Sequence, residues 1–186
     1  VKQPRLVSDL PFSPPFQSFI AVHTAQPLPE RKLVVVNSEA IAENCDEPLG
    51  YAGLVDIADE AKPRLSALFP LPAPPPGAPF GNFCERGGRF GPHNQHQHQF
   101  QDVLFRDDDL VFLTYFNAGL RIVDISDARL PREVGYFVPP DPVQRRGPQP
   151  SRLVPQSEDV IVDARGFIYV TDKNHGVYVL RYRPAG

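Results

Sequence analysis

The sequence has no methionine and no long apolar run. Without a methionine, Val1 is expected to be a processed or internal start. No stretch approaches the roughly 18 consecutive apolar residues of a transmembrane helix, so no membrane span is expected. The chain also lacks an excess of one charge, because 19 basic and 22 acidic residues leave a net charge of -3. A basic surface for nucleic acid is therefore not expected.

Cysteine is equally scarce. The two cysteines, Cys45 and Cys84, lie in the loop-like segments NCDEP and GNFCERGG. A pair of cysteines in such loops favours a disulfide and an oxidising, extracytoplasmic compartment, and two free thiols are the alternative. The chain also lacks a G-x-S-x-G elbow, a P-loop and a G-x-G-x-x-G fingerprint, which leaves the common hydrolase and nucleotide-binding classes without support.

What the chain does contain is an internal repeat. The stretch YAGLVDIADEAKPRLSALFPLP (51–72) matches GLRIVDISDARLPREVGYFVPP (119–140). In a second register, DVLFRDDDLVFLTYFNAGLRIV (102–123) matches DVIVDARGFIYVTDKNHGVYVL (159–180). Val, Ile, Phe and Tyr fill the short runs, and Gly, Asp, Asn and Pro separate them. Each unit therefore predicts four short strands.

Repeated four-stranded units predict an all-β protein of the β-propeller type. The expected segments are an outer strand of a preceding blade at 1–15, a blade at 18–72, a His-, Gly- and Pro-rich connector at 73–97, a blade at 98–140, a Pro-rich linker at 141–157 and a last blade without its outer strand at 158–186. About three blades cannot close a ring of roughly 4–8. Open sheet edges are a liability, so we expect the remainder of a larger propeller, or a partner protein, to complete it.

The units GLVDIADEAKPR (53–64) and GLRIVDISDARLPR (119–132) resemble the LVIVD-repeat family of bacterial propellers. The run NFCERGGRFGPHNQHQHQ (82–99), followed by LVFLTYFNAGLRIVDISD (110–127), resembles a motif of its extracytoplasmic members. The resemblance implies a propeller outside the cytoplasm and says little about activity. A more distant similarity is to the selenium-binding protein and methanethiol oxidase propellers, and it implies histidines around a central channel.

Polar residues begin the expected first strands, which line the channel of a propeller. They are His23, Gln101 and Glu158. Imidazole and carboxylate groups gathered in one ring suit a transition metal such as zinc or copper. Polar residues at the mouth of a water-filled channel are the alternative. Glu39 follows an apolar run on the channel side and is a candidate to join His23.

The stretch GPHNQHQHQF (91–100) is the densest group of histidines. On an extended backbone, His96 and His98 share one face because side chains alternate. His93 can fold back beside the turn residues Gly91, Pro92 and Asn94. The stretch is therefore a candidate metal site, and a solvated polar loop is the alternative.

Other polar residues favour structural roles. His175 lies in a hairpin turn in which Gly176 is expected to supply a positive φ. Asp59 and Asp127 recur before a proline, where an Asx-type hydrogen bond stabilises a turn. Long Pro-rich connectors at 71–79 and 139–155 offer surfaces for another protein.

Two functions remain open from the sequence. The favoured hypothesis is a protein-binding or scaffold module, because no strong catalytic motif is present. The second is a metal-dependent, oxidoreductase-like enzyme with His23, His93, His96 and His98 as ligands.

Overall fold

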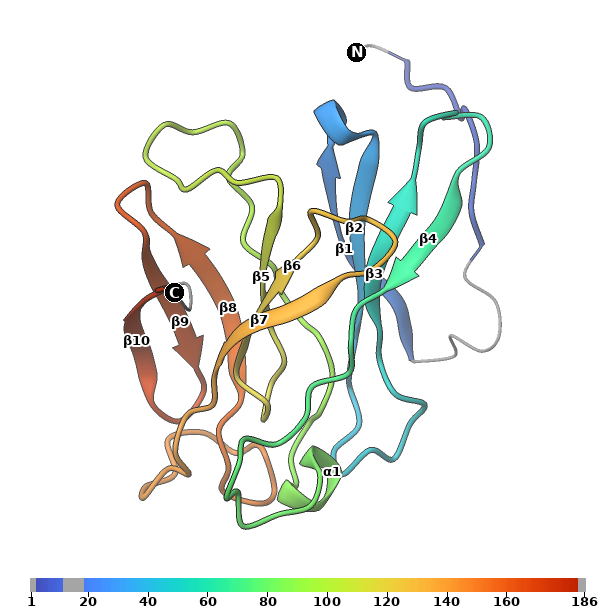
Figure 1. Ribbon diagram of the computed structural model, residues 1–186. Helices are drawn as coiled ribbons and strands as arrows, with labels where there is room; N and C mark the ends of the chain where they lie inside the picture. The colour runs from blue at the N-terminus through green and yellow to red at the C-terminus, as the bar shows by residue number, and fades with distance from the viewer. Residues whose placement is uncertain (1–2, 12–18, 184–186) are drawn as a thin grey trace.

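The computed structural model describes residues 3–11 and 19–183, and over these residues the protein is all-β. Three antiparallel sheets lie side by side, with the sheet of β5–β7 between the other two (Figure 1). The elements are β1 (Ile20–Leu28), the 3-10 turn η1 (Pro29–Arg31), β2 (Leu33–Glu39), β3 (Ala52–Asp56), β4 (Arg64–Leu68), α1 (Phe83–Arg86), β5 (Leu110–Thr114), β6 (Leu120–Asp124), β7 (Arg132–Phe137), β8 (Ser157–Val162), β9 (Phe167–Asp172) and β10 (Gly176–Arg181).

The first and third sheets match the strands expected from the repeat. The first is a four-stranded meander in the order β1-β2-β3-β4. The third pairs in the order β10-β9-β8, so the described part of the last unit has three strands. The recurrent aspartates close turns as expected: Asp59 Oδ1 accepts from the amide of Ala61 at 3.1 Å, and Asp127 Oδ1 accepts from that of Arg129 at 2.9 Å.

The second sheet differs from the expectation at its first strand. Residues 102–105 form a turn, in which Leu104 pairs with Asp163 after β8 and Phe105 N donates to Val162 O at the end of β8. The place beside β5 is taken instead by residues 93–96. His93 N donates to Thr114 O and His96 N donates to Phe112 O, each at 2.9 Å. The histidine stretch is therefore the irregular first strand of this sheet, not a loop that precedes it.

Two apolar layers join the sheets. One contains Val35 and Leu54 of the first sheet packed with Leu113 and Val123 of the second. The other contains Phe112 and Ile122 of the second sheet packed with Val160, Ile168 and Val170 of the third. Burial of alternate strand residues on both faces of β5 and β6 fixes the middle sheet between its neighbours.

A disulfide joins Cys45 to Cys84, as the sequence indicated. It links the loop after β2 to the short helix α1, where Asn82 caps the first turn by accepting from Glu85 N at 3.0 Å. Both segments lie at the lower end of the molecule in Figure 1. Gly176 has a φ of 106°, which confirms the expected turn beside His175.

The N-terminal strand expected at 1–15 is not formed over residues 3–11. Leu10 packs instead against the layer of Val36 and Val55 on the first sheet. The rest of the expected strand, 1–2 and 12–15, lies outside the described residues. Among the described residues, no helix has the length and apolar character to cross a bilayer.

Candidate functional site

The first strands of the three sheets carry residues at equivalent positions, and these residues lie near one another. Thr24 pairs with Asn37 in the first sheet. In the second sheet Asn94 N donates to Thr114 Oγ1 at 3.2 Å, and in the third Asp159 N donates to Thr171 Oγ1 at 3.1 Å. Thr24, Asn94 and Asp159 are thus equivalent. The residues that precede them are His23, His93 and Glu158, respectively, and we call these three the first-strand positions.

A second set of equivalent residues comes from the strand that follows in each sheet. Glu39 ends β2, Phe116 lies two residues after Thr114 of β5, and Lys173 lies two residues after Thr171 of β9. Each sheet therefore supplies one first-strand residue and one residue from the end of its second strand. The repeat that builds the sheets also builds the site.

Three of these side chains form a compact group of ligand atoms. His23 Nε2 lies 3.5 Å from Glu39 Oε2, and His93 Nε2 lies 3.5 Å from Glu39 Oε1. One ligand atom from each of the three lies within 4.8 Å of the others. The two imidazole rings are tilted with centroids 4.9 Å apart. Two histidines and one carboxylate in this arrangement are a set that holds catalytic zinc or iron in proteins.

The hydrogen bonds of the histidines determine which nitrogen carries the proton. His93 Nδ1 lies 2.6 Å from the carbonyl oxygen of Glu158, which can only accept, so Nδ1 is the donor. The Thr24 hydroxyl donates to the carbonyl of His93 at 3.4 Å, which leaves it to accept from His23 Nδ1 at 2.9 Å. Both Nε2 atoms therefore present lone pairs toward Glu39.

Burial favours the neutral form of His93. Loss of hydration lowers the pKa of His93 below its ordinary value, against the opposing effect of the nearby Glu158 and Glu39 carboxylates. A neutral imidazole and a carboxylate with facing lone pairs repel each other. A cation between them removes this repulsion.

Arg89 lies between the two carboxylates. Its guanidinium is 3.3 Å from Glu39 Oε1 and 3.0 Å from Glu158 Oε1. Lys173 Nζ adds a second cation 3.2 Å from Glu158. Arg89 and Lys173 thus place two positive charges beside the two carboxylates.

The ring of Phe116 packs against both Arg89 and His93. Arg89 stacks 3.7 Å from the centre of its ring, and the His93 ring stacks on it with centroids 4.8 Å apart. Phe116 is fully buried and has a φ of 40°, which is unusual for a residue with a side chain. Strained backbone of this kind is concentrated at functional sites, where the surrounding packing holds it in place.

The other histidines stay outside the group. His96 Nε2 donates to Phe105 O at 2.8 Å and its Nδ1 accepts from Val162 N at 3.1 Å, so both nitrogens join the second sheet to the third. His98 Nδ1 accepts from Phe100 N at 3.1 Å. His175 lies in a turn beside Pro140. None of the three belongs to the group of ligand atoms found among the described residues.

The structure brings some of the candidate residues together and separates others. His23, His93 and Glu39 come together, whereas Gln101 lies in an exposed turn and His93 takes its place. Arg89, Phe116 and Lys173 were not anticipated. The repeat carried a signal for two of them, because Phe116 and Lys173 align with each other two residues after Thr114 and Thr171.

No protein-family model and no curated protein matches this chain. The site is therefore interpreted from its own geometry.

Proposed function

We propose that the chain binds a divalent transition metal, zinc or copper, through His23, His93 and Glu39. The observation that carries the proposal is the set of facing lone pairs, since both histidines are fixed by their Nδ1 bonds with Nε2 toward the carboxylate. Metal-binding histidines commonly donate their second nitrogen to a carbonyl or carboxylate, which orients the ring. Here Glu158 and Thr24 have that role.

Three protein ligands leave an open coordination position, which is the pattern of catalytic rather than purely structural metal sites. His23 is exposed, so a small molecule can approach from solvent. A metal held in this way supplies a Lewis acid or, for copper, a redox centre. The proposed activity is therefore metal-dependent catalysis of the oxidoreductase type.

We further propose that the three sheets are consecutive blades of an extracytoplasmic propeller of the LVIVD-repeat type. The disulfide supports the location, because disulfides persist in oxidising compartments. Hydrogen bonds that step from sheet to sheet support the architecture. Asn37 Nδ2 donates to His93 O at 2.6 Å, and its counterpart Thr114 donates to Glu158 O at 3.0 Å. A following blade would find Thr171 in the same position.

Metal titration of the purified protein tests the proposed site. Calorimetry with zinc and with copper is expected to show one tight site per chain. His93→Ala, His23→Ala and Glu39→Gln are each expected to weaken binding by more than the roughly 10- to 100-fold that loss of an outer-shell partner costs. His175→Asn is the matched control, because His175 lies outside the group. Equal affinity in all four variants would exclude the site.

A second function, protein binding or scaffolding, is favoured by the outer face of the third sheet. Val177, Val179 and Ile161 are 62%, 60% and 45% exposed on this face. Val179 and Ile161 both pair with Tyr169, so the apolar side chains form one patch across three strands. The opposite face of the same sheet is covered by the second sheet. We propose that another sheet of the same repeat type, in this protein or in a partner, covers the patch.

Self-association of the isolated chain tests this surface. Sedimentation velocity at rising concentration is expected to show association that Val179→Lys weakens, because a charge in the patch disfavours apolar contact. Lys62→Glu changes an exposed charge in the β3–β4 turn of the first sheet, away from the patch, and serves as control. Association that is unchanged by Val179→Lys would contradict the proposal.

A further inference from the structure

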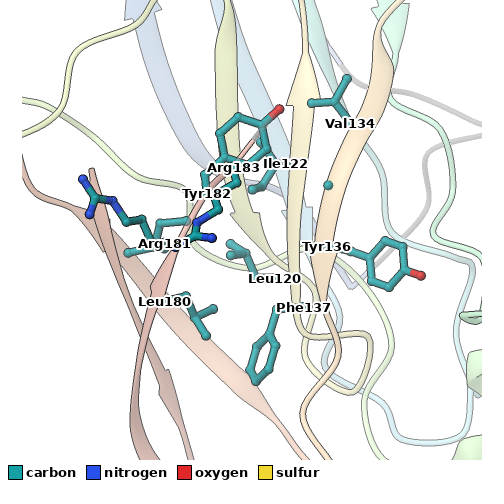
Figure 2. A pocket seen from close by; sticks show the side chains of 11 residues that line it. Leu120, Ile122, Val134, Tyr136, Phe137, Leu180, Arg181, Tyr182 and Arg183 are labelled. Carbon is teal, nitrogen blue, oxygen red and sulfur yellow. The ribbon is translucent and has the colours of Figure 1, made fainter. Parts of the chain in front are cut away.

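The outer edge of β10 is an open strand edge beside an apolar groove. Among the described residues, β10 pairs with β9 alone. A groove of about 350 Å³ opens next to its end, between β10 and β7 (Figure 2). Leu180 and Tyr182 line one side, and Leu120, Ile122 and Phe137 line the other. Gly135 has no side chain to fill the space, and an added Cβ would meet Tyr182. An unpaired edge beside an apolar groove is the setting for strand addition.

The first two sheets show what occupies this position elsewhere in the molecule. Beyond the third strand of each sheet lies an outer strand, β4 or β7, that begins with an arginine. Arg64 stands opposite Asp56, with their charged atoms 3.8 Å apart. Arg132 stands opposite Asp124 at 2.7 Å. An aspartate at the end of the third strand and an arginine at the start of the fourth thus set the register of both pairs.

The third sheet has the opposite charge at the equivalent position. The last residue of each third strand pairs with the first residue of the second strand: Asp56 with Leu33, Asp124 with Leu110. By the same rule Arg181 pairs with Phe167. Arg181 therefore replaces the aspartate. An arginine facing it would place like charges directly opposite each other, which destabilises an antiparallel pair.

We propose that the outer edge of β10 binds an extended segment of a partner protein that begins with an aspartate or glutamate opposite Arg181 and continues with alternate apolar residues. The acidic residue would pair with Arg181, and the apolar residues would fill the groove beside Leu180 and Tyr182. Backbone hydrogen bonds to β10 would supply affinity, and the charge would set the register. The inference does not depend on a metal at the histidine site.

The charge rule also disfavours the N-terminal segment 4–10 as the occupant. The sequence PRLVSDL (4–10) aligns with the outer strands and begins with the same proline and arginine. Placed on β10 of a second copy, Arg5 would face Arg181. A second copy of the chain is therefore not the expected occupant.

Peptide binding tests the proposal on the intact chain. Two fluorescein-labelled peptides, EEVGYFV and REVGYFV (132–138, which contains β7), are compared by fluorescence anisotropy, and hydrogen exchange follows the β10 amides. The acidic peptide is expected to bind about two- to ten-fold more tightly, to lose this advantage in high salt and to slow exchange along β10. In Arg181→Glu, the preference is expected to reverse.

Each other outcome overturns part of the proposal. Binding of neither peptide to the wild-type chain, or binding without protection of β10, would show that this edge does not accept a strand. Equal binding of both peptides by wild type and Arg181→Glu would remove the charge rule. A third labelled peptide, PRLVSDL, is measured in the same way, and its tighter binding than EEVGYFV would identify a second copy as the occupant. Metal titration of the same samples reports the histidine site separately, so failure of one proposal does not obscure the other.

Discussion

His93 Nδ1 donates to the carbonyl oxygen of Glu158, 2.6 Å away, so the third sheet decides which nitrogen of a second-sheet histidine carries the proton. The first sheet acts on the same residue from the other side, because Asn37 holds the carbonyl of His93 at 2.6 Å. The geometry of the site therefore depends on the packing of all three sheets. A change in how the sheets stack is expected to alter the site without any change in its ligands.

The tautomers of the histidines are the first testable consequence. Above pH 7 and without metal, His93 and His23 are expected to carry the proton on Nδ1, because each Nδ1 faces an acceptor. His96 is expected to carry it on Nε2, because its Nδ1 accepts from Val162 N. Long-range proton–nitrogen NMR spectra distinguish the two forms. An Nε2 proton on His93 would contradict the lone-pair arrangement on which the metal site depends.

Thr24 is expected to act as a positioning residue for both histidines. Its hydroxyl accepts from His23 Nδ1 and donates to His93 O. Thr24→Val removes both bonds at nearly constant volume and is expected to weaken metal binding about 10- to 100-fold, as outer-shell losses do. Thr24→Ser keeps the hydroxyl and should restore most of the affinity. Unchanged affinity in Thr24→Val would show that the hydroxyl does not position the histidines.

Local sequence patterns predicted the strands and turns well, since they depend on neighbouring residues. Short apolar runs marked β2, β6 and β9, and recurrent aspartates marked the turns after β3 and β6. The cysteine pair also followed from loop composition. His23, Glu39 and His93 were among the candidate ligands, but so were His96 and His98, which lie outside the group that the structure forms.

The first strand of the second sheet could not be predicted in the same way. The segments 93–96 and 102–105 both follow turn residues and both offer backbone groups to a neighbour. The ring of His96 decides between them, since its bonds to Phe105 O and Val162 N hold 102–105 against the third sheet. This is a tertiary contact without a local pattern. Gln101 was placed in the site, and His93 omitted from the ring, for that reason.

Acid is expected to weaken the packing of the second sheet on the third through His96. Burial, the largest effect, and the nearby His98 lower the pKa of His96 below its ordinary 6.5. The unfolded chain then binds more protons than the folded chain as the pH falls below 6.5. The stabilisation is thus complete above pH 6.5 and is lost as the pH falls through the lower, folded value. Urea midpoints measured from pH 7.5 to 5 should fall, and His96→Gln should reduce that slope. An unchanged slope in the variant would assign the effect to His93, whose pKa burial also lowers.

Reduction of the disulfide is expected to destabilise the chain. Cys45 and Cys84 are separated by 39 positions. Opening a loop of this size raises the entropy of the unfolded chain, which lowers the free energy of unfolding by about 3–4 kcal/mol. Urea denaturation of the Cys45→Ser, Cys84→Ser double variant measures the loss, and addition of reductant to the wild type should reproduce it. A double variant with the same urea midpoint as the oxidised wild type would show that the bond adds no stability.

Two glycines with nearly the same backbone form a matched pair for the hairpin that carries Phe116. Gly119 and Gly166 have φ angles of 76° and 82°, so alanine is strained at both by about 1–2 kcal/mol. At Gly166 an added Cβ meets no atom within 4 Å, whereas at Gly119 it collides with the backbone oxygen of Phe137. Gly119→Ala is therefore expected to lower the free energy of unfolding by about 1–3 kcal/mol more than Gly166→Ala does in urea denaturation.

Gly119→Ala should also weaken metal binding, because the turn that it distorts holds the Phe116 ring against His93 and Arg89. Equal stability losses in the two variants would show that the hairpin can shift away from β7, and unchanged metal affinity would show that Phe116 does not position the site.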